Sequence, residues 1–204
     1  MKRSVFFASV LAITLVAGGS AFAQAGGYYY VAYFSNANTV GAPDATLRFV
    51  NDGAASTAVV QDSPNGTLSA SLYVFDDSQE MQECCNCTVS ADGLLSESVN
   101  NNLTSNTLTG GRAERTRGVI KIISSLNPDP TANVLRTGLR GTITHLQASS
   151  TSSANGFYYV TETPVARSNL SNVELQDLEI TCGFVMYLGS GQGVCSCTPE
   201  GSDF

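Results

Sequence analysis

The six cysteines constrain the fold of this 204-residue chain more than any other feature. Three lie in Glu83-Cys84-Cys85-Asn86-Cys87, and three return near the C-terminus. Six is an even number, as complete disulfide pairing in an exported chain requires. Bonds between the two sets would close loops of roughly 100 residues and determine where the end of the chain docks. We therefore predict structural disulfides at Cys84, Cys85, Cys87, Cys182, Cys195 and Cys197.

The sequence leaves the pairing of these cysteines open among fifteen connectivities. A ring across one peptide bond is strained, so the adjacent Cys84 and Cys85 are expected to bond to different partners. One arrangement joins Cys182 to Cys195 and leaves Cys197 to reach the 84–87 cluster.

A metal site or a redox pair is the alternative use of these cysteines. The paired C-x-C steps offer soft ligands for Cu(I) or zinc, and their members are Cys85, Cys87, Cys195 and Cys197. Against metal binding, structural zinc knuckles use C-x-x-C spacing, and exported thiols tend to oxidise. A strained disulfide would instead be easily reduced, which would suit a thiol-redox protein. We expect no cofactor.

The N-terminus has the pattern of a secretory signal peptide. Lys2 and Arg3 precede an apolar run of about 13 residues, shorter than the roughly 20 that a membrane span needs. The small-x-small site Ala21-Phe22-Ala23 follows, so we predict a signal peptide over residues 1–23. The chain is therefore expected to be exported, periplasmic or extracellular, with no membrane span in the mature part. Residues 24–204 are long enough for one domain.

The charge balance argues against nucleic acid as a partner. Without Lys2 and Arg3, eight basic residues face seventeen acidic ones, a net charge of about −9. A field of this sign repels polyanions and anionic membranes. Charged residues form only 13% of the chain, as suits an extracellular β-rich protein with polar turns.

Short runs of β-branched and aromatic residues recur between Gly, Pro, Asn and Asp turns, which is typical of strands. We predict strands over residues 28–34, 45–50, 56–61, 67–75, 118–123, 139–146 and 157–162. Segments 56–61 and 67–75 should form a hairpin, and 67–75 should be half-buried. The pattern predicts an all-β fold, an immunoglobulin-like antiparallel β-sandwich of about eight strands.

One helix is predicted, over residues 171–188. Ser171 and Glu174 have the capping-box spacing, and apolar residues follow three or four apart. This face includes Cys182 and should point toward the sheets. The helix and the disulfide staples complete the expected sandwich.

Two stretches are candidate ligand surfaces. The aromatic run from Tyr28 to Phe34 can be a packed strand or a platform, with Tyr28 and Tyr30 as possible contacts. The segment 90–117 reads as a long irregular loop rooted at the cysteine cluster, and it holds the main basic cluster of the mature chain. An acidic ligand could bind there to Arg112, Arg115 and Arg117.

Catalytic patterns are weak. His145 is the only histidine, and it follows the alternation of its predicted strand, as an ordinary strand residue would. Without His145, the chain has no histidine that could activate a serine or cysteine nucleophile. Asp76, Asp77 and Glu80 could act as the acid and base of a carbohydrate-active enzyme or ligate calcium, but carboxylates are common in polar turns. No catalytic residue is assigned.

A resemblance rests on the cysteine segments. The strand end Tyr73-Val74-Phe75-Asp76, the 83–87 cluster, Cys182-Gly183-Phe184 and Gly193-Val194-Cys195-Ser196-Cys197 resemble a recurring set of exported bacterial proteins. The resemblance covers the middle and the C-terminal third of the chain. It implies a structural role for the cysteines and carries over no activity.

The most consistent function is a secreted, non-catalytic binding or structural module whose partner is a protein or glycan surface. A periplasmic metal-binding or thiol-redox protein is the first alternative. A carbohydrate-active enzyme is the second.

Overall fold

The computed structural model describes residues 27–54, 66–111, 114–148 and 157–197. The predicted signal peptide, the predicted strand over residues 56–61 with its hairpin, and Arg112 lie outside the described residues. Among the described helices, none has the length and apolar character needed to cross a membrane.

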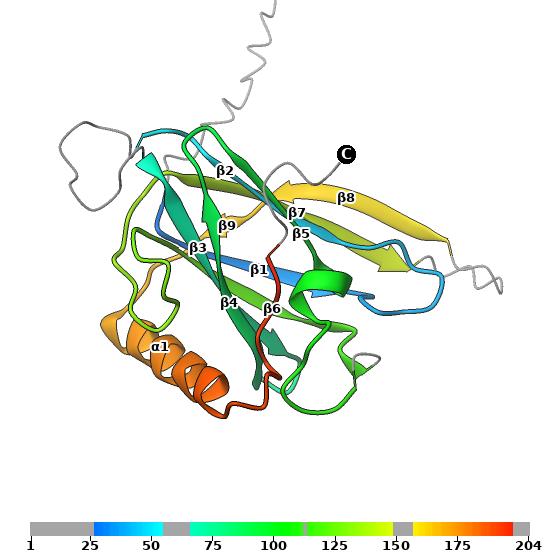
Figure 1. Ribbon diagram of the computed structural model, residues 1–204. Helices are drawn as coiled ribbons and strands as arrows, with labels where there is room; N and C mark the ends of the chain where they lie inside the picture. Colours follow the sequence, from blue (N-terminus) through cyan, green and yellow to red (C-terminus); the bar gives the residue numbers. More distant parts are fainter. Residues whose placement is uncertain (1–26, 55–65, 112–113, 149–156, 198–204) are drawn as a thin grey trace, which may run out of the picture.

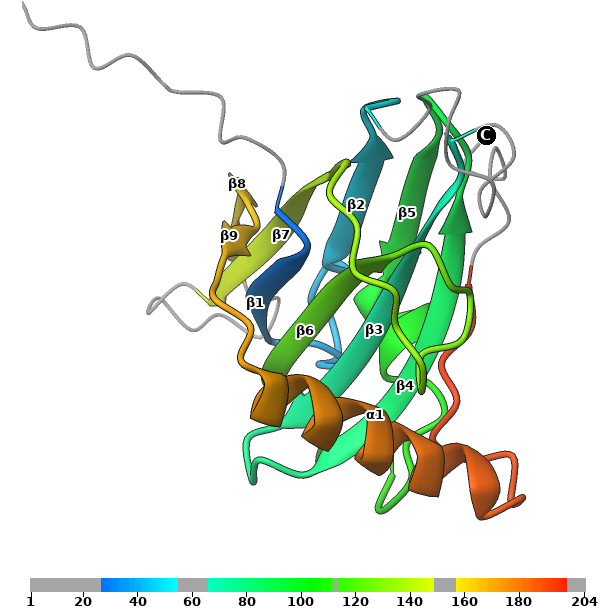
Figure 2. The ribbon, with the colours of Figure 1, turned by 90° about the vertical axis from the view of Figure 1, so that its left-hand side faces the viewer.

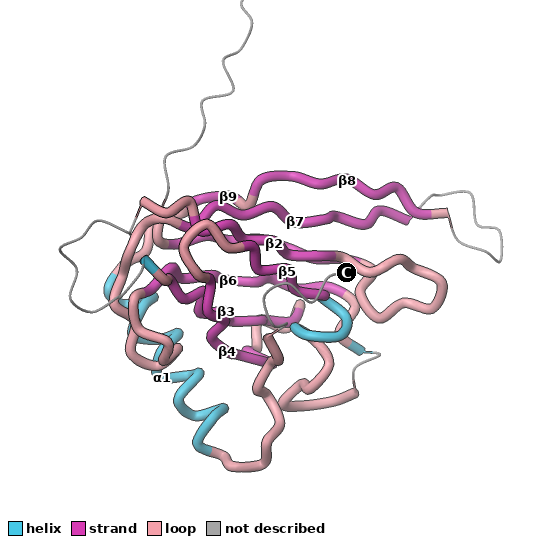
Figure 3. The backbone as a smooth tube through the Cα atoms, turned by 45° about the horizontal axis from the view of Figure 1, so that its top comes forward, coloured by secondary structure: helices cyan, strands magenta, loops and turns pink. Residues whose placement is uncertain are grey.

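Two antiparallel sheets face each other (Figures 1 and 3). The five-stranded sheet has the order β4-β3-β6-β1-β9, formed by β4 (Met81–Val89), β3 (Leu68–Asp76), β6 (Arg117–Ser125), β1 (Tyr29–Ser35) and β9 (Ala166–Arg167). The four-stranded sheet has the order β5-β2-β7-β8, formed by β5 (Leu94–Ser98), β2 (Thr46–Asn51), β7 (Leu139–Ala148) and β8 (Tyr158–Pro164). The prediction of a mostly β protein built from antiparallel sheets, with one helix and disulfides, is confirmed.

The main core lies between the two sheets. The alternating residues Tyr30, Ala32 and Phe34 of β1 are buried there, because successive side chains of a strand point to opposite faces. The ring of Tyr30 meets Phe49 of β2 edge-on, with 5.7 Å between ring centroids. Favourable edge-to-face packing of this kind links the sheets at their centre.

The helix α1 (Asn172–Tyr187) lies across the outer face of the five-stranded sheet (Figure 2). Leu178, Cys182 and Val185 of α1 are buried against Tyr73 of β3 and Ile123 of β6. The prediction that β3 is half-buried is therefore wrong. Both faces of this strand are covered, one by the opposite sheet and one by the helix.

The N-terminus of α1 is capped as the sequence indicates, but only on one side. The Ser171 hydroxyl accepts a hydrogen bond from the Glu174 N–H at 3.1 Å. The Glu174 carboxylate turns to the sheet, where it accepts from Lys121 at 2.6 Å and from the Tyr29 hydroxyl at 3.2 Å. These bonds attach the start of the helix to β1 and β6. At the other end of α1, Gly189 follows the C-cap residue Leu188 and has a φ of 64°, a left-handed conformation that commonly ends helices.

The region expected to be one irregular loop is partly regular. β5 pairs with β2 within it, and a π-helical turn, η2 (Val99–Leu103), follows at once. The cysteine cluster was expected at the base of this loop, but Cys84, Cys85 and Cys87 lie inside the strand β4. β4 forms a hairpin with β3, so the hairpin partner of β3 is the strand that carries the cysteines, and β6 pairs with the other side of β3.

Candidate functional site

Three disulfides join β4 to the end of the chain. They are Cys84–Cys182 (the first disulfide), Cys85–Cys195 (the second disulfide) and Cys87–Cys197 (the third disulfide), with Cα–Cα distances of 5.9, 5.2 and 5.4 Å. Disulfide formation is confirmed, and no cysteine is free. The suggested bond between Cys182 and Cys195 is wrong, because each of them pairs with β4.

The alternation of β4 explains this pairing. Cys84 points to the outer face of the sheet and meets Cys182 on α1. Cys85 and Cys87 belong to the core cluster between the sheets, and they bond to residues beyond the helix. The two adjacent cysteines of the strand therefore bond to different partners, as expected.

The segment that carries the last two cysteines lies along β4. The Cys84 N–H donates to the Gly193 carbonyl at 2.8 Å, and the Cys195 N–H donates to the Cys84 carbonyl at 3.3 Å. This is a parallel bridge between Cys84 and Val194. A Cβ on Gly193 would lie 2.4 Å from Val185 Cγ1, so the close approach to α1 requires glycine. The segment covers the outer edge of β4, which would otherwise expose unpaired backbone groups.

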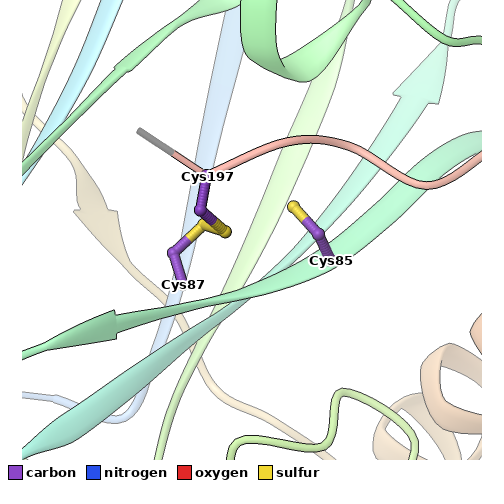
Figure 4. Close-up of side chains that lie close together, drawn as sticks. All are labelled: Cys85, Cys87 and Cys197. Carbon is purple, nitrogen blue, oxygen red and sulfur yellow. A yellow bond between two sulfur atoms is a disulfide. The ribbon is translucent and has the colours of Figure 1, made fainter. Parts of the chain in front are cut away.

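Three of the sulfur atoms gather at one point. The Sγ atoms of Cys85, Cys87 and Cys197 all lie within 4.8 Å of one another, and Figure 4 shows them together. Each of them belongs to a disulfide, whereas a metal ligand must be a thiolate. These residues could hold a soft metal only after reduction. Their spacing suits thiol–disulfide exchange, since one freed thiolate would lie beside a second disulfide.

Asp76 has a structural role at the end of β3. Its Oδ1 accepts from the N–H groups of Ser78 and Glu80 at 3.0 and 3.1 Å. Its Oδ2 accepts from Gln82 Nε2 at 2.9 Å and pairs with Arg115 Nη1 at 2.7 Å. Both members of this ion pair are largely buried. The carboxylate closes the β3–β4 turn and attaches Arg115, which lies just before β6, to that turn.

The remaining carboxylates offer no acid and base pair. Asp77 is exposed and pairs with Arg117 at 2.7 Å, and the hydrogen bond from Arg117 lowers the pKa of the Asp77 carboxyl. A glycosidase general acid needs the opposite shift. Glu80 is exposed on the turn. The geometry thus gives no support to a carbohydrate-active enzyme built on Asp76, Asp77 and Glu80.

The predicted ligand contacts are divided between core and surface. Tyr30 is buried, and its hydroxyl donates to the Leu139 carbonyl and accepts from the Gly27 N–H. Burial raises the pKa of Tyr30, so the hydroxyl stays protonated as a core donor. Tyr28 is exposed. Tyr30 therefore offers no surface to a ligand.

The two described members of the predicted basic cluster, Arg115 and Arg117, likewise form ion pairs within the chain. Arg115 is held by Asp76 and by the Thr109 carbonyl, and it is largely buried. Arg117 is exposed and pairs with Asp77. A free anion would have to compete with these carboxylates for Arg115 and Arg117.

A different surface, which sequence reasoning missed, joins β1 to the edge strand β8. The ring of Tyr33 stacks on His145 of β7, with 4.2 Å between centroids and 21° between planes. His145 Nε2 lies 2.9 Å from the Thr163 hydroxyl of β8. Burial lowers the pKa of His145, so the imidazole is held neutral. Tyr33 remains 53% exposed, and Tyr159 is 66% exposed.

We name this surface the aromatic edge. Its members are Tyr33, His145, Tyr159, Thr161 and Thr163. Thr161 pairs with His145 in register, and residues 159, 161 and 163 share one face of β8 by alternation. Among the described strands, β8 is the last of its sheet and pairs with β7 alone. The surface therefore combines exposed aromatic rings with hydroxyl groups and no charged side chain.

Comparisons with known proteins add no relative. No family model, no curated protein and no solved structure matches this chain.

Proposed function

We propose that this chain is an exported, non-catalytic binding module that holds a neutral glycan on the aromatic edge. The observation that carries the proposal is the Tyr33 ring, which is stacked on a buried histidine on one side yet half exposed to solvent. A core tyrosine would be covered, and a freely moving surface tyrosine would have no such support. Tyr33 is therefore preorganised, and a fixed ring loses little freedom when a ligand binds.

The chemistry of the aromatic edge suits a saccharide. A sugar ring offers an apolar C–H face to an aromatic ring, and its hydroxyls need nearby donors and acceptors. Tyr33 and Tyr159 supply the rings, and Thr161 supplies an exposed hydroxyl beside them. The absence of charge among these five residues favours a neutral ligand, in agreement with the acidic balance of the whole chain.

An immunoglobulin-like scaffold is part of the proposal. In such domains, strands B and E pair in one sheet, while C lies between C′ and F in the other. β2 and β5 pair in one sheet, and β3 lies between β4 and β6 in the other, so β2 to β6 follow the order B, C, C′, E, F. The ends differ, because β1 pairs with β6 and β7 pairs with β2.

An exported location is also part of the proposal. Three disulfides form and persist in oxidising compartments, which is consistent with the signal-like N-terminus. We therefore propose a periplasmic or extracellular location.

The test is binding of the purified protein to a glycan array, followed by calorimetry with a soluble oligosaccharide that gives a signal. Tyr33→Ala and Tyr159→Ala should each weaken binding by about tenfold, which is the ratio that 1.4 kcal/mol of lost stacking gives. Tyr187→Ala is the matched control, since Tyr187 is an exposed tyrosine on α1, and the three variants are compared by the calorimetry alone, because a multivalent array would also respond to any association of the chain. Equal losses in all three variants, or no glycan bound at all, would refute the proposal.

A thiol-redox role is the second candidate, and the 4.8 Å cluster of Cys85, Cys87 and Cys197 favours it. A dithiol that reduced the third disulfide would itself be oxidised to a disulfide and would leave both Cys87 and Cys197 as thiols, either of which can lose its proton to give a thiolate. That thiolate could attack the second disulfide and form a new S–S bond as the other sulfur leaves as a thiolate. Titration with a dithiol buffer, read by intact mass after alkylation, tests this role. A structural set should stay oxidised in buffers poised at potentials down to about −300 mV, whereas a redox-active disulfide should be reduced at a less negative potential.

A further inference from the structure

The C-terminal half of α1 is apolar on the side that faces away from the sheet, whereas Gln176 and Asp177 are exposed on that side nearer the start of the helix. The exposed apolar residues of this half are Ile180, Phe184, Tyr187 and Leu188. Phe184 is 68% exposed and Tyr187 is 92% exposed. Residues buried against the sheet lie on the other side of the same helix, so these side chains add nothing to docking. Contiguous exposed apolar surface on a helix indicates an interaction site.

This surface contains a hollow with the geometry of a coiled-coil hole. Ile180, Gly183, Phe184 and Tyr187 surround an open space of about 300 Å³. Their spacing is i, i+3, i+4 and i+7, the four positions that receive a side chain from a facing helix. Gly183 leaves the hollow open, since a Cβ there would meet, among the described residues beyond its chain neighbours and the adjacent backbone of its own helix, only Thr131 Cγ2 at 3.9 Å.

We propose that a second copy of this chain packs on α1, with the two helices antiparallel and each Phe184 inserted in the hollow of the other. A two-fold symmetric contact must be self-complementary, so knob and hole have to lie on the same patch. Phe184 and Gly183 are neighbours on this helix and satisfy that condition. Glycine at the crossing point allows the helices to approach closely.

The distribution of charge favours this occupant and this direction. Residues 180–188 contain no ionisable group except the Tyr187 phenol and the disulfide-bonded Cys182, while Glu174, Asp177 and Glu179 lie toward the start of the helix. With the two-fold axis between Gly183 and Phe184, Asp177 faces position 190 of the partner, beyond the end of its helix. A parallel pair would place like charges side by side. A neutral patch lets two copies of an acidic chain meet where the repulsion between them is weakest.

The size of the patch predicts a weak dimer. A Phe or Tyr ring buries roughly 150–250 Å², so Phe184 and Tyr187 would remove roughly 300 Å² from water in each copy. Ile180 and Leu188 bring the total for both copies to about 1,000 Å², the lower limit for a specific interface. Dissociation in the micromolar range is expected.

Sedimentation velocity of the purified, oxidised protein from about 1 μM to about 300 μM, a range that brackets such affinities, tests the proposal. The wild type should shift reversibly from monomer to dimer. Phe184→Asp should remain monomeric, and Gly183→Leu should weaken the dimer at least tenfold by filling the hollow. Phe157→Asp is the matched control, because Phe157 is also 68% exposed but lies beside β8. It should dimerise like the wild type.

Three outcomes overturn the proposal: a wild type that stays monomeric throughout, a Phe184→Asp variant that still dimerises, or a dimer that Phe157→Asp abolishes. Circular dichroism and the mass of the three-disulfide form establish that each variant is folded. If Phe184→Asp does not fold, Tyr187→Asp takes its place. The glycan proposal is tested separately, since α1 and β8 lie on different faces of the molecule (Figure 1).

Discussion

The double variant Cys87→Ala with Cys197→Ala lacks the third disulfide, and its loss of stability shows whether the three cross-links act independently. In a nested set, one disulfide already holds together the segments that the next one joins. Taken alone, the third disulfide spans a sequence separation of 110 residues. A cross-link stabilises mainly by restricting the unfolded chain, and a loop of this length is worth about 4.8 kcal/mol in the chain-entropy model. If the three bonds acted independently, this loss would be expected for the double variant.

The bonds are nested, however, and this changes the magnitude. The second disulfide joins Cys85 to Cys195, each two residues from a cysteine of the third. With the second disulfide intact, the third closes only a ring of about six residues, worth about 2 kcal/mol in the same model. The first disulfide closes a larger ring, of about 15 residues, because Cys182 lies well before Cys195. Its removal should cost about 3 kcal/mol.

Equilibrium unfolding in urea, followed by tyrosine fluorescence and far-UV circular dichroism without reductant, measures these free energies. Free energies rather than midpoints must be compared, because loss of a cross-link expands the unfolded state and raises the m-value. The third-disulfide variant should lose less stability than the variant lacking Cys84 and Cys182. A loss near 5 kcal/mol for the third disulfide would refute the nested-loop reasoning.

Two further predictions concern buried polar groups. Asp76→Asn should lower the free energy of unfolding by about 3 kcal/mol in the same urea assay, because it leaves Arg115 buried without its charge partner. Asp77→Asn is the control, and it should have no measurable effect because it alters an exposed ion pair. Burial lowers the pKa of His145 below its ordinary value of 6.5, so protonation favours the unfolded chain and stability should fall as the pH drops through this value. His145→Gln should remove that part of the pH dependence, and an unchanged profile would contradict the assignment.

Local pattern was enough for much of the fold. β1, β2, β6 and β7 were predictable because β-branched and aromatic residues fill them and turn residues bound them. The capping signal at Ser171 located the start of α1 within a residue. In both cases the information is carried by neighbours in the sequence.

Tertiary contacts decided the elements that sequence reasoning missed. β4 has the sequence Met-Gln-Glu-Cys-Cys-Asn-Cys-Thr-Val, whose polar residues do not favour a strand. Gln82 and Glu83 are buried all the same, because the 104–109 segment donates hydrogen bonds to them: Asn106 N–H to Glu83, and Thr109 to Gln82. The strand exists because β3 pairs with it on one side and the C-terminal segment on the other.

The aromatic run of β1 shows why the candidate site could not be read from the sequence. Alternation separates Tyr30 from Tyr29 and Tyr33, but it does not say which face is covered. The sandwich core takes Tyr30, and α1 covers Tyr29. The helix does not bury Tyr33, so that ring is exposed beside His145. Exposure here depends on where a helix some 140 residues later happens to lie.

The outer face of the C-terminal half of α1 is apolar although the docking of the helix on the sheet does not require it. One apolar stripe is enough to dock a helix on a sheet, and Leu178, Val185 and the first disulfide already hold α1 in place. Phe184 and Tyr187 point the other way and contribute nothing to that contact. Large apolar side chains in water lower solubility and favour unspecific association, so a fold that needed only docking would carry polar residues there. The covalent attachment of α1 to β4 makes the outer face a rigid surface, and rigidity is what a shallow helix–helix contact of limited area requires.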